Sequence, residues 1–247
     1  ARARVAGRRS GVTRPVTIVV PSYRDTAWLA EHLPLVRDEL QRRDLGDELL
    51  VVDDGAGDVA KALAGVVPEA RVVEHATNRG FAASIATGVR EARCDLVFLM
   101  NPDVCPRAGF LDPLVRALDD PAVAAAAPFV LLDGERVDAE SLSRLAWRRG
   151  FPVLAAAEVA HARRSGDDAT VHPAAFALGG ASLWRRADLL DEGAFDALYE
   201  PFYWEDVDRA WRAWRAGRRI VVCTDSEVEH HNRGTIGRVV PEPLVRA

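Results

Sequence analysis

Two adjacent carboxylates, Glu205 and Asp206, stand at the start of an apolar helical pattern in the segment PFYWEDVDRAWRAWRAG, residues 201–217. Neighbouring negative charges repel each other, so the pair needs an environment that tolerates both. The first turn of a helix provides one, because the helix dipole favours ionised carboxylates there. An ionised carboxylate can also remove a proton from a hydroxyl group within its reach. The pair is therefore either a solvated helix start or a candidate general base.

Polar residues also follow three apolar segments in the first half of the chain, at the point where each segment ends. Asp and Asn in such positions are typical of turns and helix caps, which is the simpler explanation for any one of the three groups. In a wound parallel sheet, however, ligands bind beyond the carboxyl ends of the strands. We therefore expect the three groups to share one site. They are Pro21-Ser22-Tyr23, Asp53-Asp54-Gly55 and Asn101-Pro102-Asp103.

Carboxylate oxygens and imidazole nitrogens at such an edge can hold a hard divalent cation, Mg²⁺ or Mn²⁺. Asp103 is a candidate carboxylate ligand. His230 or His231, after the last apolar segment, is a candidate imidazole ligand, and a solvated surface pair is the alternative for the two histidines. A cation held there would neutralise the charge that builds on a leaving diphosphate. A base, a cation site and polar strand ends are together what a nucleotide-sugar site needs.

The elements that must position these residues alternate between apolar strands and helices. We expect strands at residues 16–20, 48–52, 71–74 and 95–100, and helices at residues 26–43, 59–66 and 80–92 between them. Near-continuous apolar strands separated by helices predict an α/β fold with a Rossmann-like, mostly parallel wound sheet and helices on both faces.

The second half of the chain is less regular. We expect a helix around residues 139–149, a strand at 176–184, a helix at 205–216, and strands at 219–223 and 227–231. The strand at 176–184 contains Gly180, where a ligand can approach the backbone closely. Val207, Trp211 and Trp214 recur at spacings of four and three, which predicts that this stripe of the helix packs in the core.

Five segments, in order, resemble the family-2 inverting glycosyltransferases of GT-A fold. They are VTIVVPSYRD, LLVVDDGAGD, NRGFAASIATGV, FLMNPDV and the block from LGGASLW to DRAWRAWRAG. The third is similar to a segment of rhamnosyltransferase-like members, the fourth to the "LNPD" form of the DxD motif, and the fifth to the acceptor-side block that ends in the "ED" motif. The match runs from Val16 to about Gly234. It implies transfer of a sugar from a nucleotide-diphosphate-sugar to an acceptor hydroxyl, with inversion.

The resemblance also implies a role for each matching residue. Asp206 would be the general base, supported by Glu205, and Asp103 would bind the metal together with His230 or His231. Tyr203 and Trp204 precede the helix, and we expect them to border the acceptor site with Gly180. The residues expected at the nucleotide are Pro21, Tyr23, Asp53, Asp54, Arg79, Gly80 and Asn101.

Several positions depart from the family pattern. Asn101 replaces the first acid of the DxD motif, which leaves the metal charge mainly to Asp103. Residues 84–87 differ from the usual motif and leave the donor sugar open. Arg209 stands where a leucine is usual, and Ala56 where a serine is usual.

Two other functions fit parts of the sequence. Residues 55–60 match G-x-G-x-x-A after a strand, as in a nicotinamide-dependent oxidoreductase. Asp53, Asp54 and Asp58 oppose that function, because their carboxylates would repel a pyrophosphate at the helix start. The loss of one DxD acid favours the second alternative, a catalytically silent module that binds nucleotide sugars.

Composition excludes several classes of protein. The 247 residues carry a net charge of −5, yet residues 1–15 hold five arginines and no acid. We expect a basic, disordered arm there, and the alternative is that this arm contacts a membrane surface. The rest of the chain is expected to form one domain at 16–240, with a nucleotide-binding half (16–104) and an acceptor-binding half (105–240). The acidic remainder argues against a nucleic-acid partner.

Three scattered cysteines predict neither a zinc site nor disulfides, and no signal peptide or membrane span is apparent. We expect a cytoplasmic protein, or one at the inner face of the membrane. Its expected partners are the nucleotide-diphosphate-sugar donor and a glycan, lipid-linked or small-molecule acceptor. Because the chain starts with Ala and its sole methionine is Met100, we also expect the original start to be missing or processed.

Overall fold

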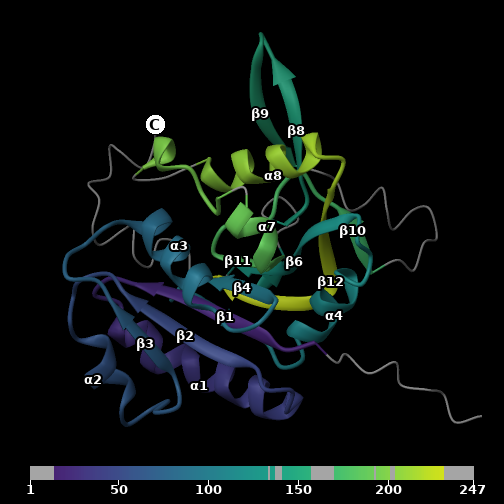
Figure 1. The fold of residues 1–247 in the computed structure, drawn as a ribbon. Coiled ribbons are helices and arrows are strands. Elements are labelled where there is room, and N and C mark those ends of the chain that lie inside the picture. The colour runs from purple at the N-terminus through teal and green to yellow at the C-terminus, as the bar shows by residue number, and fades with distance from the viewer. Residues whose placement is uncertain are drawn as a thin grey trace, which may run out of the picture.

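The computed structural model describes residues 14–132, 134–136, 141–156, 170–191, 193–200 and 204–230 (Figure 1). Most of the basic arm, and the site candidates Tyr203 and His231, lie outside these residues. Among the described helices, none is both long and apolar enough to cross a membrane.

The first half of the chain forms the alternating pattern that the sequence predicts. Its elements are β1 (Val16–Ser22), α1 (Thr26–Arg43), β2 (Glu48–Asp53), α2 (Val59–Leu63), β3 (Arg71–Glu74), α3 (Phe81–Glu91) and β4 (Leu96–Met100). The four strands pair in parallel in the order β4-β1-β2-β3, so that their carboxyl ends lie along one edge. The predicted Rossmann-like sheet is therefore confirmed.

The second half extends the same sheet. Its elements are β5 (Val104–Pro106), α4 (Leu111–Ala117), β6 (Val123–Leu132), β7 (Glu135–Arg136), β8 (Ser143–Arg148), β9 (Phe151–Ala156), β10 (Val171–Pro173), β11 (Ala181–Arg185), α7 (Arg186–Asp191), the 3₁₀ turn η1 (Ala197–Tyr199), α8 (Glu205–Arg215) and β12 (Arg219–His230). The sheet order continues as β4-β11-β6-β12-β10. β11 runs antiparallel to β4 and β6, whereas β6 and β12 are parallel.

The helix expected around residues 139–149 is wrong. Residues 143–156 form the β8–β9 hairpin, which projects from the body of the protein (Figure 1). The turn consists of Arg149 and Gly150, with φ of 50° and 86°. Positive φ at both turn residues matches the twist of a two-residue hairpin turn and cannot continue a helix.

Two other boundaries differ from the prediction. The strand expected at 176–184 begins only at Ala181, because Gly179 and Gly180 form a turn in which the Ala181 amide donates to the Leu178 carbonyl. The two strands expected at 219–223 and 227–231 are one strand, β12, whose register against β6 shifts between Cys223 and Glu227.

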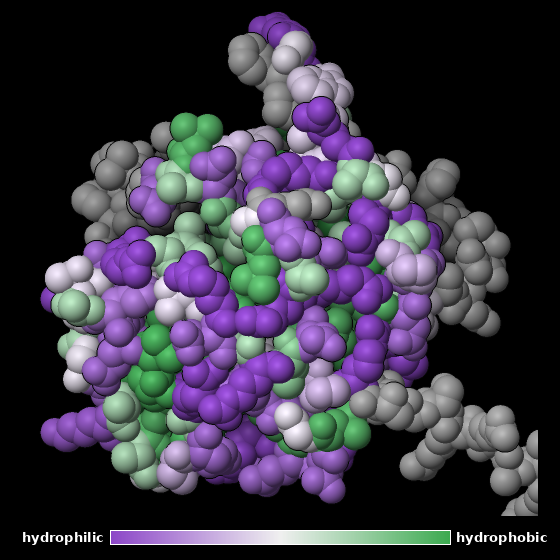
Figure 2. Space-filling view, viewed as in Figure 1, coloured by the Kyte–Doolittle hydropathy of each residue, from purple (hydrophilic) through white to green (hydrophobic). Residues whose placement is uncertain are grey.

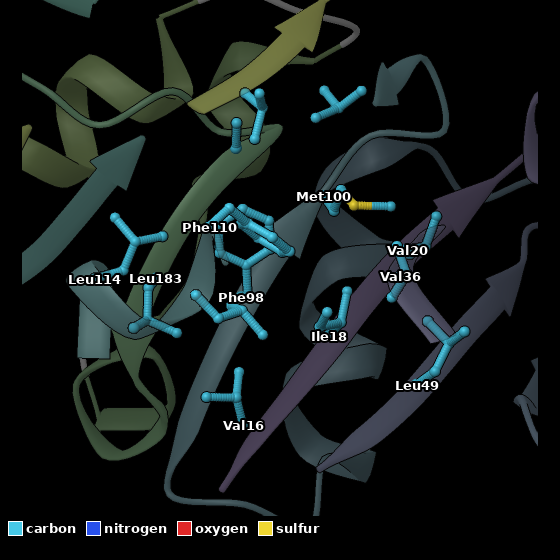
Figure 3. Packing of buried hydrophobic residues seen from close by; sticks show 14 of the residues in the cluster. Val16, Ile18, Val20, Val36, Leu49, Phe98, Met100, Phe110, Leu114 and Leu183 are labelled. Atoms are coloured by element: carbon cyan, nitrogen blue, oxygen red, sulfur yellow. The ribbon is translucent and has the colours of Figure 1, made fainter. Parts of the chain in front are cut away.

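The core has two parts, one on each face of the sheet. Alternate residues of β1 face opposite ways, so that Ile18 belongs to one cluster and Val19 to the other. Helices α1, α2 and α4 cover the first cluster, and α3, α7 and α8 cover the second (Figure 1). Figure 3 shows the first cluster, in which Phe98 and Phe110 lie edge to face. The outer surface in Figure 2 is mainly polar, with scattered apolar residues.

The prediction that the apolar stripe of α8 packs in the core is mostly wrong. Val207 is buried, but Trp211 and Trp214 are 46% and 37% exposed. The core face of α8 instead carries Ala210 and Ala213. Small side chains let the helix lie close to the sheet, which leaves no room for an indole between them.

Candidate active site

Asp53 organises the loop that follows β2. Its carboxylate is fully buried and accepts hydrogen bonds from the amides of Ala56 (2.9 Å), Gly57 (3.0 Å) and Val59 (3.3 Å). These are the amides that the G-x-G-x-x-A pattern would offer to a pyrophosphate. Because Asp53 already occupies them, the loop does not have the geometry of a dinucleotide site.

Gly55 permits this loop to touch the loop that follows β3. A Cβ atom on Gly55 would lie 2.4–2.7 Å from backbone atoms of Thr77 and Asn78, and the residue has φ of 85°. Only glycine fits both the contact and the backbone conformation. The two loops therefore form one unit at the carboxyl edge of the sheet.

Asp54 joins the same two loops through its side chain. It is 4% exposed and accepts from the amides of Arg79 (2.8 Å) and Gly80 (2.9 Å) and contacts the ring nitrogen Nδ1 of His75 (2.8 Å). A carboxylate has about four acceptor positions, so these contacts leave room for about one more donor. Asp54, Arg79 and Gly80, which we expect at the nucleotide, are thus brought together.

The end of β1 lies beside this unit. Pro21 is buried in the strand, and the Ser22 carbonyl accepts from the Asp54 amide at 2.8 Å. Tyr23 is half-buried, and the Arg24 guanidinium lies 5.0 Å from its ring centroid. Arg24 has φ of 61°, unusual for a residue with a side chain.

A glycine turn connects the end of β4 to the start of α8. The Asn101 amide donates to the Gly180 carbonyl at 2.8 Å, and a Cβ on Gly180 would lie 2.4 Å from the Asn101 side chain. The next glycine, Gly179, donates its amide to Asp206 Oδ2 at 3.3 Å. Asn101, Gly180 and Asp206 are therefore neighbours, although 79 and 26 positions separate them in the chain.

Glu205 and Asp206 occupy the first turn of α8, as predicted. Burial raises the pKa of Asp206, although hydrogen bonds from the Val207 and Gly179 amides oppose the shift. Burial, with a smaller contribution from Asp206, raises the pKa of Glu205 to about 7. Desolvation thus outweighs the helix dipole, which alone predicts lower values. Trp204, 40% exposed, precedes the pair with φ of 79°.

Asp103 and His230 form the candidate metal centre. Asp103 is 6% exposed, and its Oδ1 has no hydrogen-bond partner within the described part of the chain. The His230 Nε2 atom lies 3.6 Å from that oxygen. A buried carboxylate oxygen without a donor beside an imidazole fits a divalent cation. Across the described ranges, no group of three or more His, Cys, Asp or Glu residues is arranged to hold a metal ion.

The segment that follows η1 also reaches the loop that precedes α3. Glu200 follows η1, and its Oε1 lies 3.7 Å from the position of a Cβ on Gly80. Sequence reasoning missed both Glu200 and His75. His75 directly follows β3 at the same edge, which is the one signal that could have identified it.

Comparison with known proteins identifies the family and the fold of the chain. Residues 17–189 match the model of "Glycosyl transferase family 2". Two curated proteins of Mycobacterium tuberculosis, from strains CDC 1551 / Oshkosh and ATCC 25618 / H37Rv, are both named pre-mycofactocin glycosyltransferase and are 29% identical over 228 residues. The match covers 89% of this chain and 43% of each relative, so the chain spans less than half the length of these relatives.

Two solved structures share the fold. GalNAc-T7 with UDP, GalNAc and Mn²⁺ superposes with a TM-score of 0.72 at 13% identity, covering 89% of this chain and 44% of that one. The mannosyltransferase PcManGT from Pyrobaculum calidifontis, in complex with GDP-Man and Mn²⁺, gives a TM-score of 0.62 at 21% identity, covering 91% and 59%. By its family match and by its GT-A fold, this chain belongs to glycosyl transferase family 2.

Proposed function

We propose that this protein is an inverting glycosyltransferase that moves a sugar from a nucleotide-diphosphate-sugar to an acceptor hydroxyl. The observation that carries the proposal is the glycine turn, which holds the Asp206 carboxylate beside the end of β4. Asn101 and Asp103 follow that strand, so a base and a candidate metal ligand face the same edge as the nucleotide loops.

Asp206 acts as the general base in this mechanism. One of its oxygens takes the proton of the acceptor hydroxyl while that hydroxyl oxygen attacks the anomeric carbon. The bond between the anomeric carbon and the diphosphate oxygen breaks on the opposite side, so the configuration inverts and no covalent enzyme intermediate forms. The raised pKa of Asp206 strengthens it as a base, since a group with a pKa nearer to the working pH accepts a proton more readily.

The nucleotide loops would hold the donor. Asp54 offers its remaining acceptor position to a nucleoside N–H or hydroxyl group, and the exposed Arg79 supplies positive charge at the start of α3. Tyr23 lies beside them, with Pro21 and Asp53 supporting the strand ends. The solved structures with UDP or GDP-Man support a donor of this class.

Asp103 and His230 would hold a divalent cation, and Mn²⁺ in both solved structures supports this assignment. The cation, when bound, would stabilise the negative charge that develops on the departing diphosphate. Asn101 contributes no charge, so the affinity of the cation would depend strongly on the bound diphosphate.

The acceptor would bind at the start of α8, beside the proposed base. The exposed indole of Trp204 offers a flat apolar surface to a sugar ring or another ring system. The name of the mycobacterial relatives, pre-mycofactocin glycosyltransferase, supports pre-mycofactocin or a compound like it as the acceptor.

The decisive test is a pair of carboxamide variants on α8. Asp206→Asn should lower kcat by about 10³-fold or more while the affinity for UDP or GDP with Mn²⁺ stays unchanged. Asp208→Asn, in the same helical turn, loses the ion pair with Arg212 (3.0 Å) and is the matched control with near-normal turnover. Equal turnover by the two variants would remove Asp206 from the mechanism.

Chelation tests the metal assignment. EDTA should abolish transfer, and Mn²⁺ or Mg²⁺ should restore it. Full activity in the chelator would contradict the role of Asp103. A screen of nucleotide sugars could instead show that the wild-type protein binds nucleotide but neither transfers the sugar nor hydrolyses the donor. That result would favour a silent binding module.

A further inference from the structure

Behind Asp54, a chain of hydrogen bonds runs into helix α3. The His75 ring lies between two partners, with Nδ1 2.8 Å from Asp54 Oδ1 and Nε2 3.0 Å from Thr87 Oγ1. The Arg90 guanidinium donates to the same Thr87 oxygen at 3.0 Å. The side chains of His75 and Asp54 are 5% and 6% exposed, so solvent does not readily replace these contacts.

The chemistry of the two ends fixes the direction of the two outer bonds. A guanidinium only donates, so Thr87 Oγ1 accepts from Arg90, and its own proton is free to point at His75. An ionised carboxylate only accepts, so His75 Nδ1 must carry the proton that faces Asp54. The ring therefore donates to Asp54 through Nδ1, and the Thr87 hydroxyl lies within hydrogen-bond distance of Nε2.

We propose that His75 is a positioning residue for the donor nucleotide. Through Nδ1–H it orients the Asp54 carboxylate, which in turn holds the Arg79 and Gly80 amides at 2.8 and 2.9 Å. This inference rests on the proposed function, because it assigns the Asp54 unit to the donor. It adds a residue outside the motifs that identify the site.

The His75 backbone strengthens the assignment. Its amide donates to the Asp53 carbonyl at 2.8 Å, which extends the pairing of β2 and β3 by one residue. The ring is thereby fixed at its own backbone, at Asp54 and at Thr87. A side chain fixed at three points orders the carboxylate before the ligand arrives, which lowers the cost of binding.

Three substitutions of His75 separate the two ring nitrogens. His75→Phe keeps the ring but removes both polar atoms, and it should raise the KM for the donor about 10- to 100-fold with kcat within about threefold. His75→Asn places an amide donor near the position of Nδ1 and should restore the donor KM to within about threefold of wild type. His75→Gln reaches only toward Nε2 and should not restore it.

A matched pair of threonine variants controls for general destabilisation. Thr87→Val removes the hydroxyl that orients the ring and should raise the donor KM about three- to tenfold. Thr17→Val removes another buried hydroxyl, which contacts Glu48 at 2.8 Å at the opposite edge of the sheet, and it should leave the donor KM unchanged. Equal effects of the two valine variants would overturn the proposal.

The other contrary results are equally clear. An unchanged donor KM in His75→Phe, or rescue by Gln in place of Asn, would each overturn it. The proton position has its own readout, because ¹⁵N spectra of the wild-type protein report which ring nitrogen is protonated. A proton on Nδ1 supports the proposal, and its absence refutes it. This readout does not depend on the proposed function, which would fail separately if the protein bound no UDP- or GDP-sugar in the presence of Mn²⁺.

Discussion

Gly180 lies against the Asn101 side chain at the end of β4, and adding one methyl group there tests the geometry of the site. A Cβ on Gly180 would lie 2.4 Å from both Cγ and Nδ2 of Asn101, and 2.7 Å from Oδ1. Carbon atoms need roughly 3.5 Å, so one of the two residues must move by about 1 Å. The Asn101 backbone cannot retreat without breaking its 2.8 Å hydrogen bond to Gly180.

Overpacking of this kind costs about 1–3 kcal/mol, so we expect Gly180→Ala to lower the free energy of unfolding by that amount. In an Asn101→Ala background the collision disappears, and the same substitution should cost less than about 0.5 kcal/mol. The neighbouring Gly179→Ala is the control, because its Cβ would meet its nearest atoms at 3.4–3.7 Å, which is ordinary contact.

Chemical denaturation of the four variants and the wild type gives these free energies, and sugar transfer measured on the same samples gives kcat. We expect Gly180→Ala also to lower kcat, because a shift of the turn moves the Gly179 amide that holds Asp206. If the cost persisted in the Asn101→Ala background, or if Gly179→Ala cost as much, the close contact would not be the cause and the reasoning would fail.

Two further predictions concern ionisation and loop contact. Since the pKa of Glu205 is raised to about 7, the folded protein holds a proton that the unfolded chain releases near its ordinary value of 4.5, so stability falls as the pH rises from about 4.5 to 7. Glu205→Gln should reduce this slope when thermal unfolding is measured from pH 4.5 to 8, and an unchanged slope would contradict the burial of Glu205. Gly55→Ala should cost about 1–3 kcal/mol more than Gly57→Ala. Both glycines have positive φ, but only Gly55 would collide with Thr77-Asn78; equal denaturation midpoints would refute that contact.

Most of the first half of the fold could be predicted, because its strands are continuous apolar runs between amphipathic helices. The limits of α1, Thr26–Arg43, agree with the predicted range. The β8–β9 hairpin could not be predicted, because Arg149 adopts φ of 50°, a conformation that only the hairpin as a whole stabilises. The burial of Trp211 and Trp214 was predicted wrongly for a different reason. The periodicity of a sequence indicates which side chains share a face of the helix, but not whether the space beneath that face can hold them.

The position of the candidate acids at one edge of the sheet could be predicted, and the contacts between them could not. Strand ends drew attention to Asp54, Asn101 and Asp103, since the edge of a parallel sheet is where ligands bind. Nothing in the sequence shows that Gly180 accommodates Asn101, or that His75 faces Asp54, because these contacts depend on loops that meet only in three dimensions. Their roles at the site remain predictions until the variants are measured.

The β8–β9 hairpin has a further consequence. Its strands pair only with each other among the described strands, while its base is anchored by buried Leu142 and by the bond from the Val130 amide to the Ser141 hydroxyl at 2.7 Å. Mutations in the outer part of the hairpin therefore disturb neither the main sheet nor the nucleotide loops. The outer part of the hairpin can therefore vary in length and sequence while the pairing of the main sheet stays the same.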